Sequence, residues 1–283
     1  MKSRKPTHEP APFDSDARIL GAERSPELEL AFLFGIAAFA YFAGLATDAY
    51  LLRLVAKPWP VIALARWISL ARPRLGLVSA ALYAGALGDV LLELGDATFM
   101  AGVVAFLVGH LLYVGAMVGE TRTPHLIRAL PPVLVFSVVV GLLAQEMGTR
   151  VIPFAVYGVA LSALVWRAAA RIGAPGIDRR LAILGTAGAA SFMLSDTIIG
   201  FDRFLGGVPG ARWLVIITYW LAQAALAASF ALGEDPPAVL APPAPQPTPS
   251  VAAPAESGSR RERGRDGDDD DRDEAENDEE EDR

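Results

Sequence analysis

Long apolar runs dominate the sequence between residues 29 and 232, and short polar segments separate them. A helix rises about 1.5 Å per residue, so roughly 20 apolar residues cross the ~30 Å hydrocarbon core of a bilayer. This pattern predicts an all-α, polytopic transmembrane helix bundle with eight spans. The spans are expected near residues 29–52, 59–72, 75–94, 97–118, 127–146, 151–170, 181–200 and 212–232.

The second predicted span is the weakest of the eight. Pro60 and Pro73 bracket only 12 residues, and Arg66 lies in the middle of them. A basic side chain is costly at the centre of a bilayer, and 12 residues are too few to cross it. Seven spans are therefore the alternative count.

The two ends of the chain differ from its apolar middle. Residues 1–28 form a polar leader of mixed charge, without the short apolar core of a signal peptide. Residues 233–283 begin with a Pro-rich spacer and continue into a run that brings the segment to 17 acidic and 6 basic residues. Such a segment has too little apolar surface to offset the entropy of folding, so we expect a disordered tail. The membrane domain is expected to span residues 29–232.

Basic residues are unevenly distributed over the predicted loops. With eight spans, nine Arg residues fall in the loops of one side, together with five Lys or Arg residues of the leader, against five on the other side. Basic loops tend to stay in the cytoplasm, so both termini are expected there. The chain holds 22 Arg and 3 Lys residues with abundant Ala and Gly, which is typical of a GC-rich bacterial genome. We therefore expect a protein of a bacterial inner membrane.

Polar and ionisable side chains recur inside the predicted spans. An ionisable group in a bilayer costs a few kcal/mol or more unless it is paired or faces water, so each one is a candidate functional residue. The ionisable residues are Asp48, Lys57, Asp89, Glu93, His110 and Asp196, and the uncharged ones are Tyr113, Ser195, Tyr219 and Gln223.

The eight-span topology places most of these residues at one depth. Odd-numbered spans run outward, so Asp48, Asp89 and Asp196 fall near the outward ends of spans one, three and seven. Tyr219 and Gln223 lie one helical turn apart in the outer half of span eight. A pocket open to the outer leaflet or to outer water accounts for this arrangement. Lys57 begins span two at the same level, and His110 and Tyr113 lie deeper in span four.

Several of these residues also have a purely structural interpretation. Glu93 and Asp96 lie close to a span end, so we interpret them as interfacial charges. His110 taken alone is more often a histidine packed and hydrogen-bonded between helices than a catalyst. Asp89 and Asp196 differ, because each lies in an apolar helix without a basic residue one turn away. These two are the strongest functional candidates.

Some kinds of chemistry are excluded by the residues present. The chain has no cysteine, which excludes thiolate catalysis and Cys-based metal sites. Apart from His8 in the leader, only His110 and His125 are available, too few for a three-histidine zinc site. Ser195 and Asp196 lack a GxSxG context, and neighbours on a helix point about 100° apart. We expect no metal, no cofactor and no nucleic-acid partner, which leaves carboxylate chemistry.

The polar motifs resemble those of the YhhN-type lysoplasmalogenase family of eight-span membrane proteins. They occur in the order and at the spacing of that family, and the resemblance runs from about residue 30 to 232. The leader and the acidic tail lie outside it. The motifs are KPWP (57–60), LGDVLLE (87–93), FMAGVVAFLVGHLLYV (99–114), LSDTIIGFDRF (194–204) and TYWLAQ (218–223).

The resemblance implies a membrane-embedded hydrolase that acts on ether bonds. Its substrate would be a membrane lipid, a lysoplasmalogen or a related lysolipid or ether lipid, and its products a fatty aldehyde and a glycerophospho-base. A vinyl ether is cleaved by protonation of carbon and capture of the oxocarbenium ion by water, which two carboxyl groups can share. Asp89 and Asp196 are the expected catalytic pair, with the acid and base roles left open. The family's other polar positions correspond to Lys57, His110, Tyr113, Ser195, Tyr219 and Gln223, which we expect to bind substrate.

The alternative function is that of a small-molecule or proton-coupled transporter. Transporters also place acids and histidines in membrane spans, but typically at breaks in helices near the midplane. Here the acids gather towards one side of the predicted bundle, which favours the hydrolase.

Overall fold

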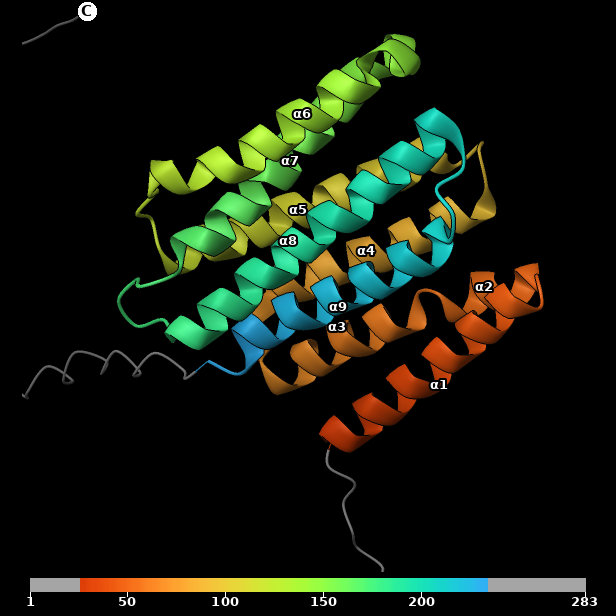
Figure 1. Cartoon of the computed structure of the whole chain (residues 1–283). Coiled ribbons are helices and arrows are strands. Elements are labelled where there is room, and N and C mark those ends of the chain that lie inside the picture. Colours follow the sequence, from red (N-terminus) through yellow and green to blue (C-terminus); the bar gives the residue numbers. More distant parts are fainter. Residues whose placement is uncertain (1–25, 234–283) are drawn as a thin grey trace, which may run out of the picture. The chain divides into compact units, whose positions relative to one another are not determined.

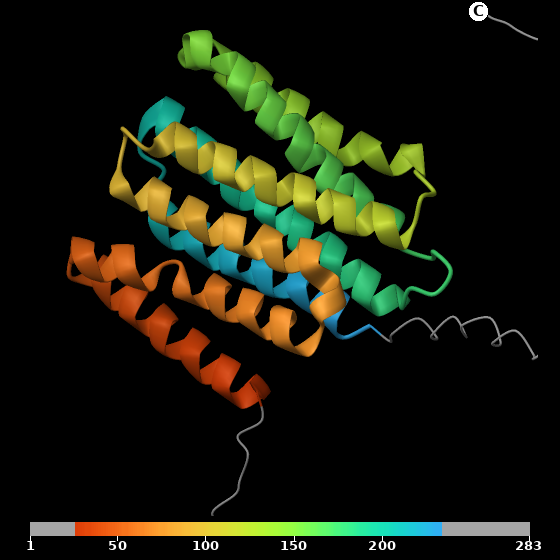
Figure 2. The same cartoon turned by 180° about the vertical axis from the view of Figure 1, so that it is seen from behind.

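The computed structural model describes residues 26–233, which form a bundle of helices and contain no strand (Figures 1 and 2). The prediction of an all-α membrane bundle is confirmed. Residues 1–25 and 234–283, which hold nearly all of the predicted leader and tail, lie outside the described residues. The helices are α1 (Pro26–Ala46), α2 (Tyr50–Ala56), α3 (Trp59–Ala71), α4 (Gly76–Leu94), α5 (Phe99–Glu120), α6 (Leu130–Met147), α7 (Val151–Ala170), α8 (Arg179–Phe201) and α9 (Ala211–Ala231).

Seven helical stretches within the described residues are long and apolar enough to cross a membrane. One of them, Leu126–Ala170, consists of two helices, α6 and α7, which lie side by side in both views of the bundle (Figures 1 and 2). The chain reverses between them at Gly148, whose φ of +53° lies in the left-handed region that glycine adopts most readily. Counting this stretch as two spans gives the eight that the sequence predicts.

The boundary between the first two spans differs from the prediction. The apolar run predicted as one span to residue 52 is broken at Asp48, which has φ +53° and turns the chain. Residues 50–56 belong instead to α2, which continues into α3 across a break at Pro58 and makes one candidate span, Tyr50–Ala71. The second span is therefore long enough to cross the membrane. Hydropathy overlooks the turn because Thr47 and Asp48 are its only polar residues.

The surface of the bundle is apolar, as expected for contact with lipid. Large side chains such as Phe32, Leu134 and Ile152 are exposed on it. Helix α6 lies at one edge of the bundle and α1 at the other (Figure 1). Successive spans alternate in direction, so the beginning of α1 and the end of α9 lie at the same end of the bundle. We call the other end, which holds Asp48 and Asp96, the opposite end.

Candidate active site

Asp89 lies at the end of a buried chain of hydrogen bonds that joins side chains of α4, α5 and α9. Tyr113 donates from its hydroxyl to Gln223 Oε1 at 2.8 Å, and Gln223 Nε2 donates to the Tyr219 hydroxyl at 3.3 Å. Tyr219 in turn donates to Asp89 Oδ2 at 2.9 Å. All four side chains are buried, and Asp89 is only 1% exposed. The structure thus brings four of the predicted site residues into one connected network.

Gly85 lets this network reach α4. It lies one helical turn before Asp89, and a Cβ at this position would meet Gln223 Nε2 at 2.7 Å and the Tyr219 hydroxyl at 3.2 Å. Any larger residue would compete with the amide and the phenol for the same space. The glycine therefore lets the polar side chains of α9 approach the backbone of α4.

Asp196 has a separate partner on a neighbouring helix. It lies on α8, is half-buried, and accepts a hydrogen bond from the hydroxyl of Tyr157 on α7. Each of the two predicted acids is therefore bonded to its own tyrosine, and among the described residues no hydrogen bond joins Asp89 to Asp196.

His110 packs against Tyr157, the partner of Asp196, and against Phe192, which in turn contacts Tyr219. Its ring centroid is 5.2 Å from that of Tyr157 and 4.6 Å from that of Phe192, and Phe192 lies 5.4 Å from Tyr219. The imidazole is 1% exposed, yet neither of its ring nitrogens has a hydrogen-bond partner in the structure. Buried polar groups are usually hydrogen-bonded, so these nitrogens are free to bind a water molecule or a polar group of a ligand.

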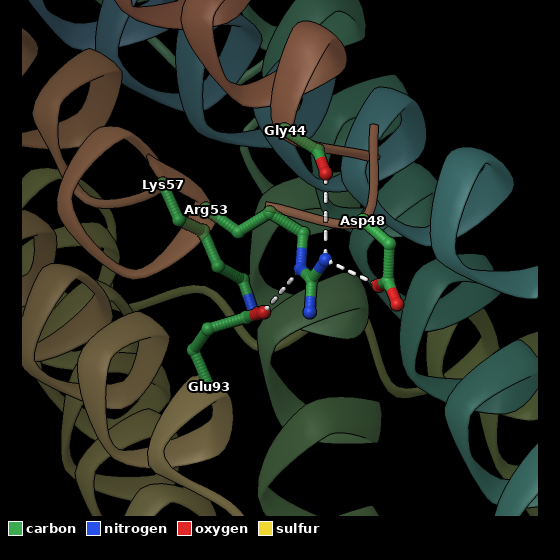
Figure 3. Close-up of polar contacts among 5 residues, drawn as sticks. All are labelled: Gly44, Asp48, Arg53, Lys57 and Glu93. Carbon is green, nitrogen blue, oxygen red and sulfur yellow. Dashed lines mark hydrogen bonds and ion pairs between the residues drawn. The ribbon is translucent and has the colours of Figure 1, made fainter. Parts of the chain in front are cut away.

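Glu93 holds two cations at the opposite end of the bundle (Figure 3). It lies one turn after Asp89 and accepts hydrogen bonds from Arg53 Nε at 3.1 Å and from Lys57 Nζ at 3.3 Å. Arg53 also donates to Asp48 at 2.8 Å and to the Gly44 carbonyl oxygen at 3.3 Å. We call Asp48, Arg53, Lys57 and Glu93 the ion cluster.

The interpretation of Glu93 as an interfacial charge is wrong. Its side chain is mostly buried, because α2 folds back against α4 and covers it. Asp96, three residues further on, is exposed and pairs with Arg203 at 2.7 Å, as expected of a charge near the membrane surface. Lys57, a predicted substrate-binding residue, forms an ion pair with Glu93 through its ammonium group.

The hydroxyl of Ser195 takes part in a hydrogen bond between two helices. Its hydroxyl donates to the main-chain carbonyl of Val215 on α9 at 3.1 Å, which joins α8 to α9. Its assignment to substrate binding stays a prediction. Among residues 26–233, no three His, Asp or Glu side chains are grouped so that they could hold a metal ion.

Sequence reasoning missed Tyr157 and Arg53. Tyr157 carries the same signal as Tyr113 and Tyr219, a phenol inside an apolar span, but the one ionisable residue of its span, Arg167, lies near the span end and was counted with the loops. Arg53 was assigned to a loop because the first span was extended to residue 52.

An apolar pocket lies between α5, α6, α7 and α8. Its walls are formed mainly by Leu, Val, Met and Phe side chains of these four helices. Asp196 and its partner Tyr157 are among the lining residues, and Thr197 is the other polar one. The pocket therefore combines an apolar interior with a carboxyl group in its wall.

Residues 52–230 match the model of the YhhN family. The chain belongs to the YhhN family. The match includes α2 to α9 almost completely, with every predicted site residue from Lys57 to Gln223, and it leaves out Asp48.

Curated relatives of this YhhN-family chain include proteins named lysoplasmalogenase. The chain is 34% identical to lysoplasmalogenase TMEM86B of Homo sapiens over 172 residues, which cover 59% of this chain and 70% of that protein. It is 33% identical to TMEM86B of Sus scrofa over 150 residues, 53% of this chain and 61% of the relative. It is 34% identical to a lysoplasmalogenase of Mycobacterium tuberculosis over 167 residues, 56% of this chain and 61% of the relative. The chain thus covers less than two thirds of the last two relatives. No solved structure matches the chain.

Proposed function

We propose that the protein hydrolyses the vinyl ether bond of a lysoplasmalogen, or of a closely related lysolipid, inside the membrane. The products are a fatty aldehyde and a glycerophospho-base. The observation that carries the proposal is the carboxyl group of Asp196 in the wall of an apolar pocket, in a chain whose relatives are named lysoplasmalogenase. Such a pocket suits a substrate whose reactive bond is attached directly to a hydrocarbon chain.

The reaction needs one group that donates a proton and another that accepts one. We assign the donor to Asp196 because it lines the pocket, and the acceptor to Asp89. Asp196 protonates the vinyl carbon that is not bonded to oxygen, and the adjacent carbon becomes an oxocarbenium ion. Water adds to that carbon and gives its proton to Asp89, which yields a hemiacetal.

Collapse of the hemiacetal restores both acids. Its hydroxyl proton passes to Asp196 as the carbonyl of the aldehyde forms. The proton held by Asp89 goes to the departing glycerol oxygen, so Asp89 is again a carboxylate and Asp196 again an acid. The ring nitrogens of His110, which packs against Tyr157, have no hydrogen-bond partner in the structure and suit a role in holding the attacking water.

The helices that carry the acids do not favour a transporter. Transporters of known architecture bind substrate at breaks in membrane helices. Here α4 continues without a break through Asp89, and α8 does so through Asp196.

Replacement of each acid by its amide tests the proposal. Asp89→Asn and Asp196→Asn keep the shape of the side chain but cannot transfer the proton. General acid or base catalysis contributes about 10²- to 10⁴-fold, so each variant should lose at least 100-fold in aldehyde release from a lysoplasmalogen in detergent. The control is Asp96→Asn, which alters an exposed carboxylate at the opposite end of the bundle. Its rate of aldehyde release should stay within a few fold of wild type. If both variants melt like wild type and keep its rate, the carboxylate mechanism is wrong.

A further inference from the structure

Helix α6 lies at the edge of the bundle, and most of its residues are not buried. Only Pro132, Leu143 and Met147 of its 18 residues are buried. It packs along α7, and it also contacts α8 and the short helix Asp202–Gly206 that follows α8. The apolar pocket lies between α6 and the helices α5, α7 and α8, and we refer to it as the pocket behind α6.

The length of the pocket matches one leaflet of a bilayer. Its wall on α6 extends from Val135 to Met147, which at about 1.5 Å per residue corresponds to ~18 Å. Half of the ~30 Å hydrocarbon core is about 15 Å, the depth occupied by the chain of one lipid. The pocket is therefore long enough for a chain that lies in the leaflet next to it.

Asp196 lies part of the way along this pocket. It is five residues from the end of α8 at Phe201, whereas Phe136 on the wall of α6 is 11 residues from the end of α6 at Met147. Both helix ends lie at the opposite end of the bundle (Figure 1). A stretch of apolar wall therefore continues past the carboxyl group towards the middle of the membrane, in the direction that the hydrocarbon chain of a membrane lipid takes.

We propose that the pocket behind α6 holds the hydrocarbon chain of the substrate, that the chain enters sideways from the bilayer past α6, and that Val139 lies against it. This inference rests on the proposed function, because it assigns the chain of the same lysolipid to the pocket. Lipid tails are as apolar as the pocket walls, so the chain gains little from desolvation. The role of the pocket is to fix the vinyl ether bond next to Asp196.

Adjacent residues of α6 supply a matched pair of variants. Val139 lines the pocket, whereas Val138 is exposed on the outside of the bundle. In Val139→Trp the indole occupies the space of the chain and displaces the vinyl ether bond. Because a displacement of 1 Å can cost about 10²-fold, we expect a 10- to 100-fold loss of aldehyde release. Val138→Trp adds the same side chain on the lipid side and should stay within about two-fold of wild type.

A second measurement reads out binding of the chain without catalysis. The probe is an alkyl-ether lysophospholipid with a diazirine in its chain, which has no vinyl ether bond to hydrolyse. Photolysis should label the α6 peptide around Val139 in the wild-type protein and in Val138→Trp, and labelling should fall at least five-fold in Val139→Trp. If Val139→Trp does not fold, Val139→Phe is the smaller substitute.

The two measurements separate the chain site from the proposed function. Labelling of α6 that Val139→Trp abolishes supports the chain site, even if the wild-type protein releases no aldehyde from a lysoplasmalogen. In that case only the proposed reaction fails. Labelling that is equal in the two Trp variants, or that falls outside the residues that line the pocket, overturns the chain site.

Discussion

Replacing Glu93 by Gln removes the charge on which Arg53 and Lys57 converge (Figure 3). The side chains of Glu93, Arg53 and Lys57 are 10%, 7% and 12% exposed, so water screens their interaction only weakly. The amide of Gln has nearly the same shape and can accept one hydrogen bond through its oxygen. Its amino group, however, would point a donor at a cation.

The expected loss of stability depends on which hydrogen-bond partners Arg53 and Lys57 keep when Glu93 is replaced. Arg53 keeps its bond to Asp48, but Lys57 has no other acceptor among residues 26–233. Breaking a buried ion pair by removing one partner costs about 3–5 kcal/mol. Since Arg53 stays paired and Asp48 is exposed to water, we expect a loss of about 2–3 kcal/mol in the free energy of unfolding. For a domain of this size, 1 kcal/mol lowers the melting temperature by about 2–4 °C, so Glu93→Gln should melt about 4–12 °C below wild type.

The assay is thermal unfolding in detergent, and Asp96→Asn is its control. The Asp96–Arg203 pair is shorter, at 2.7 Å, than the Lys57–Glu93 pair at 3.3 Å, but its side chains are 82% and 35% exposed. Exposed ion pairs contribute about 0–1 kcal/mol, so this variant should melt within about 3 °C of wild type. Burial, and not distance, is thus expected to rank the two variants.

A double variant makes the test sharper. Lys57→Met removes the cation that Glu93→Gln leaves unpaired, and an apolar replacement of a buried ion pair is often neutral or stabilising. The Lys57→Met/Glu93→Gln protein should therefore melt above Glu93→Gln alone. If Glu93→Gln melts as close to wild type as Asp96→Asn does, the reasoning is refuted, and Glu93 behaves as the interfacial charge that its position in the sequence indicates.

Three further predictions concern the network and the ends of the chain. Tyr219→Phe removes the hydrogen-bond donor to Asp89. Because a hydrogen bond to a charged group contributes about 1.5–3 kcal/mol, aldehyde release should fall about 10- to 100-fold. An unchanged rate would mean that this bond plays no part in turnover. Deletion of residues 236–283, which lie outside the family match, should leave the rate within two-fold, and loss of activity in a stably expressed truncation would contradict this. A reporter fused after Leu232 should read cytoplasmic; an external signal would reverse the orientation inferred from the basic loops.

The number of membrane spans was predictable from hydropathy, whereas one of their boundaries was not. A run of apolar residues measures how much chain a bilayer can cover, but it does not detect a reversal that needs only two polar residues. At Asp48 a φ of +53° turns the chain within an otherwise apolar stretch, and the seven residues of α2 join the next span instead. The same reversal at Gly148 was predicted, because polar residues on both sides mark it.

The members of the candidate site were easier to predict than their partners. A polar residue in an apolar span stands out in the sequence, which is how Asp89, Tyr219 and Gln223 were found. Which residue it meets depends on which helix packs next to it and on how that helix is rotated. The pairing of Asp196 with Tyr157 of α7 follows from such packing, and no spacing along the chain encodes it.

The burial of Glu93 shows the same limitation from another direction. Its distance from the end of α4 served as a measure of its exposure, and that measure holds only when nothing covers the helix end. Here α2 packs against α4 and supplies Arg53 at that point, so Glu93, two positions before Gly95, is mostly buried within the ion cluster. Asp96, just beyond the covered end, has the exposed pairing that the same measure predicted correctly.

The two acids occupy environments that suit different parts of one reaction. Asp89 accepts a hydrogen bond from Tyr219 at the end of the network that includes Gln223 and Tyr113, and it is not among the residues that line the apolar pocket. Asp196 has a single tyrosine partner and forms part of the wall of the apolar pocket. A hydrocarbon chain with its vinyl ether bond can thus approach Asp196 from the lipid side, while a water molecule is best held on the polar side. His110 packs against Tyr157, the partner of Asp196, and its ring nitrogens have no hydrogen-bond partner in the structure, which makes it a candidate to hold the attacking water near Asp196.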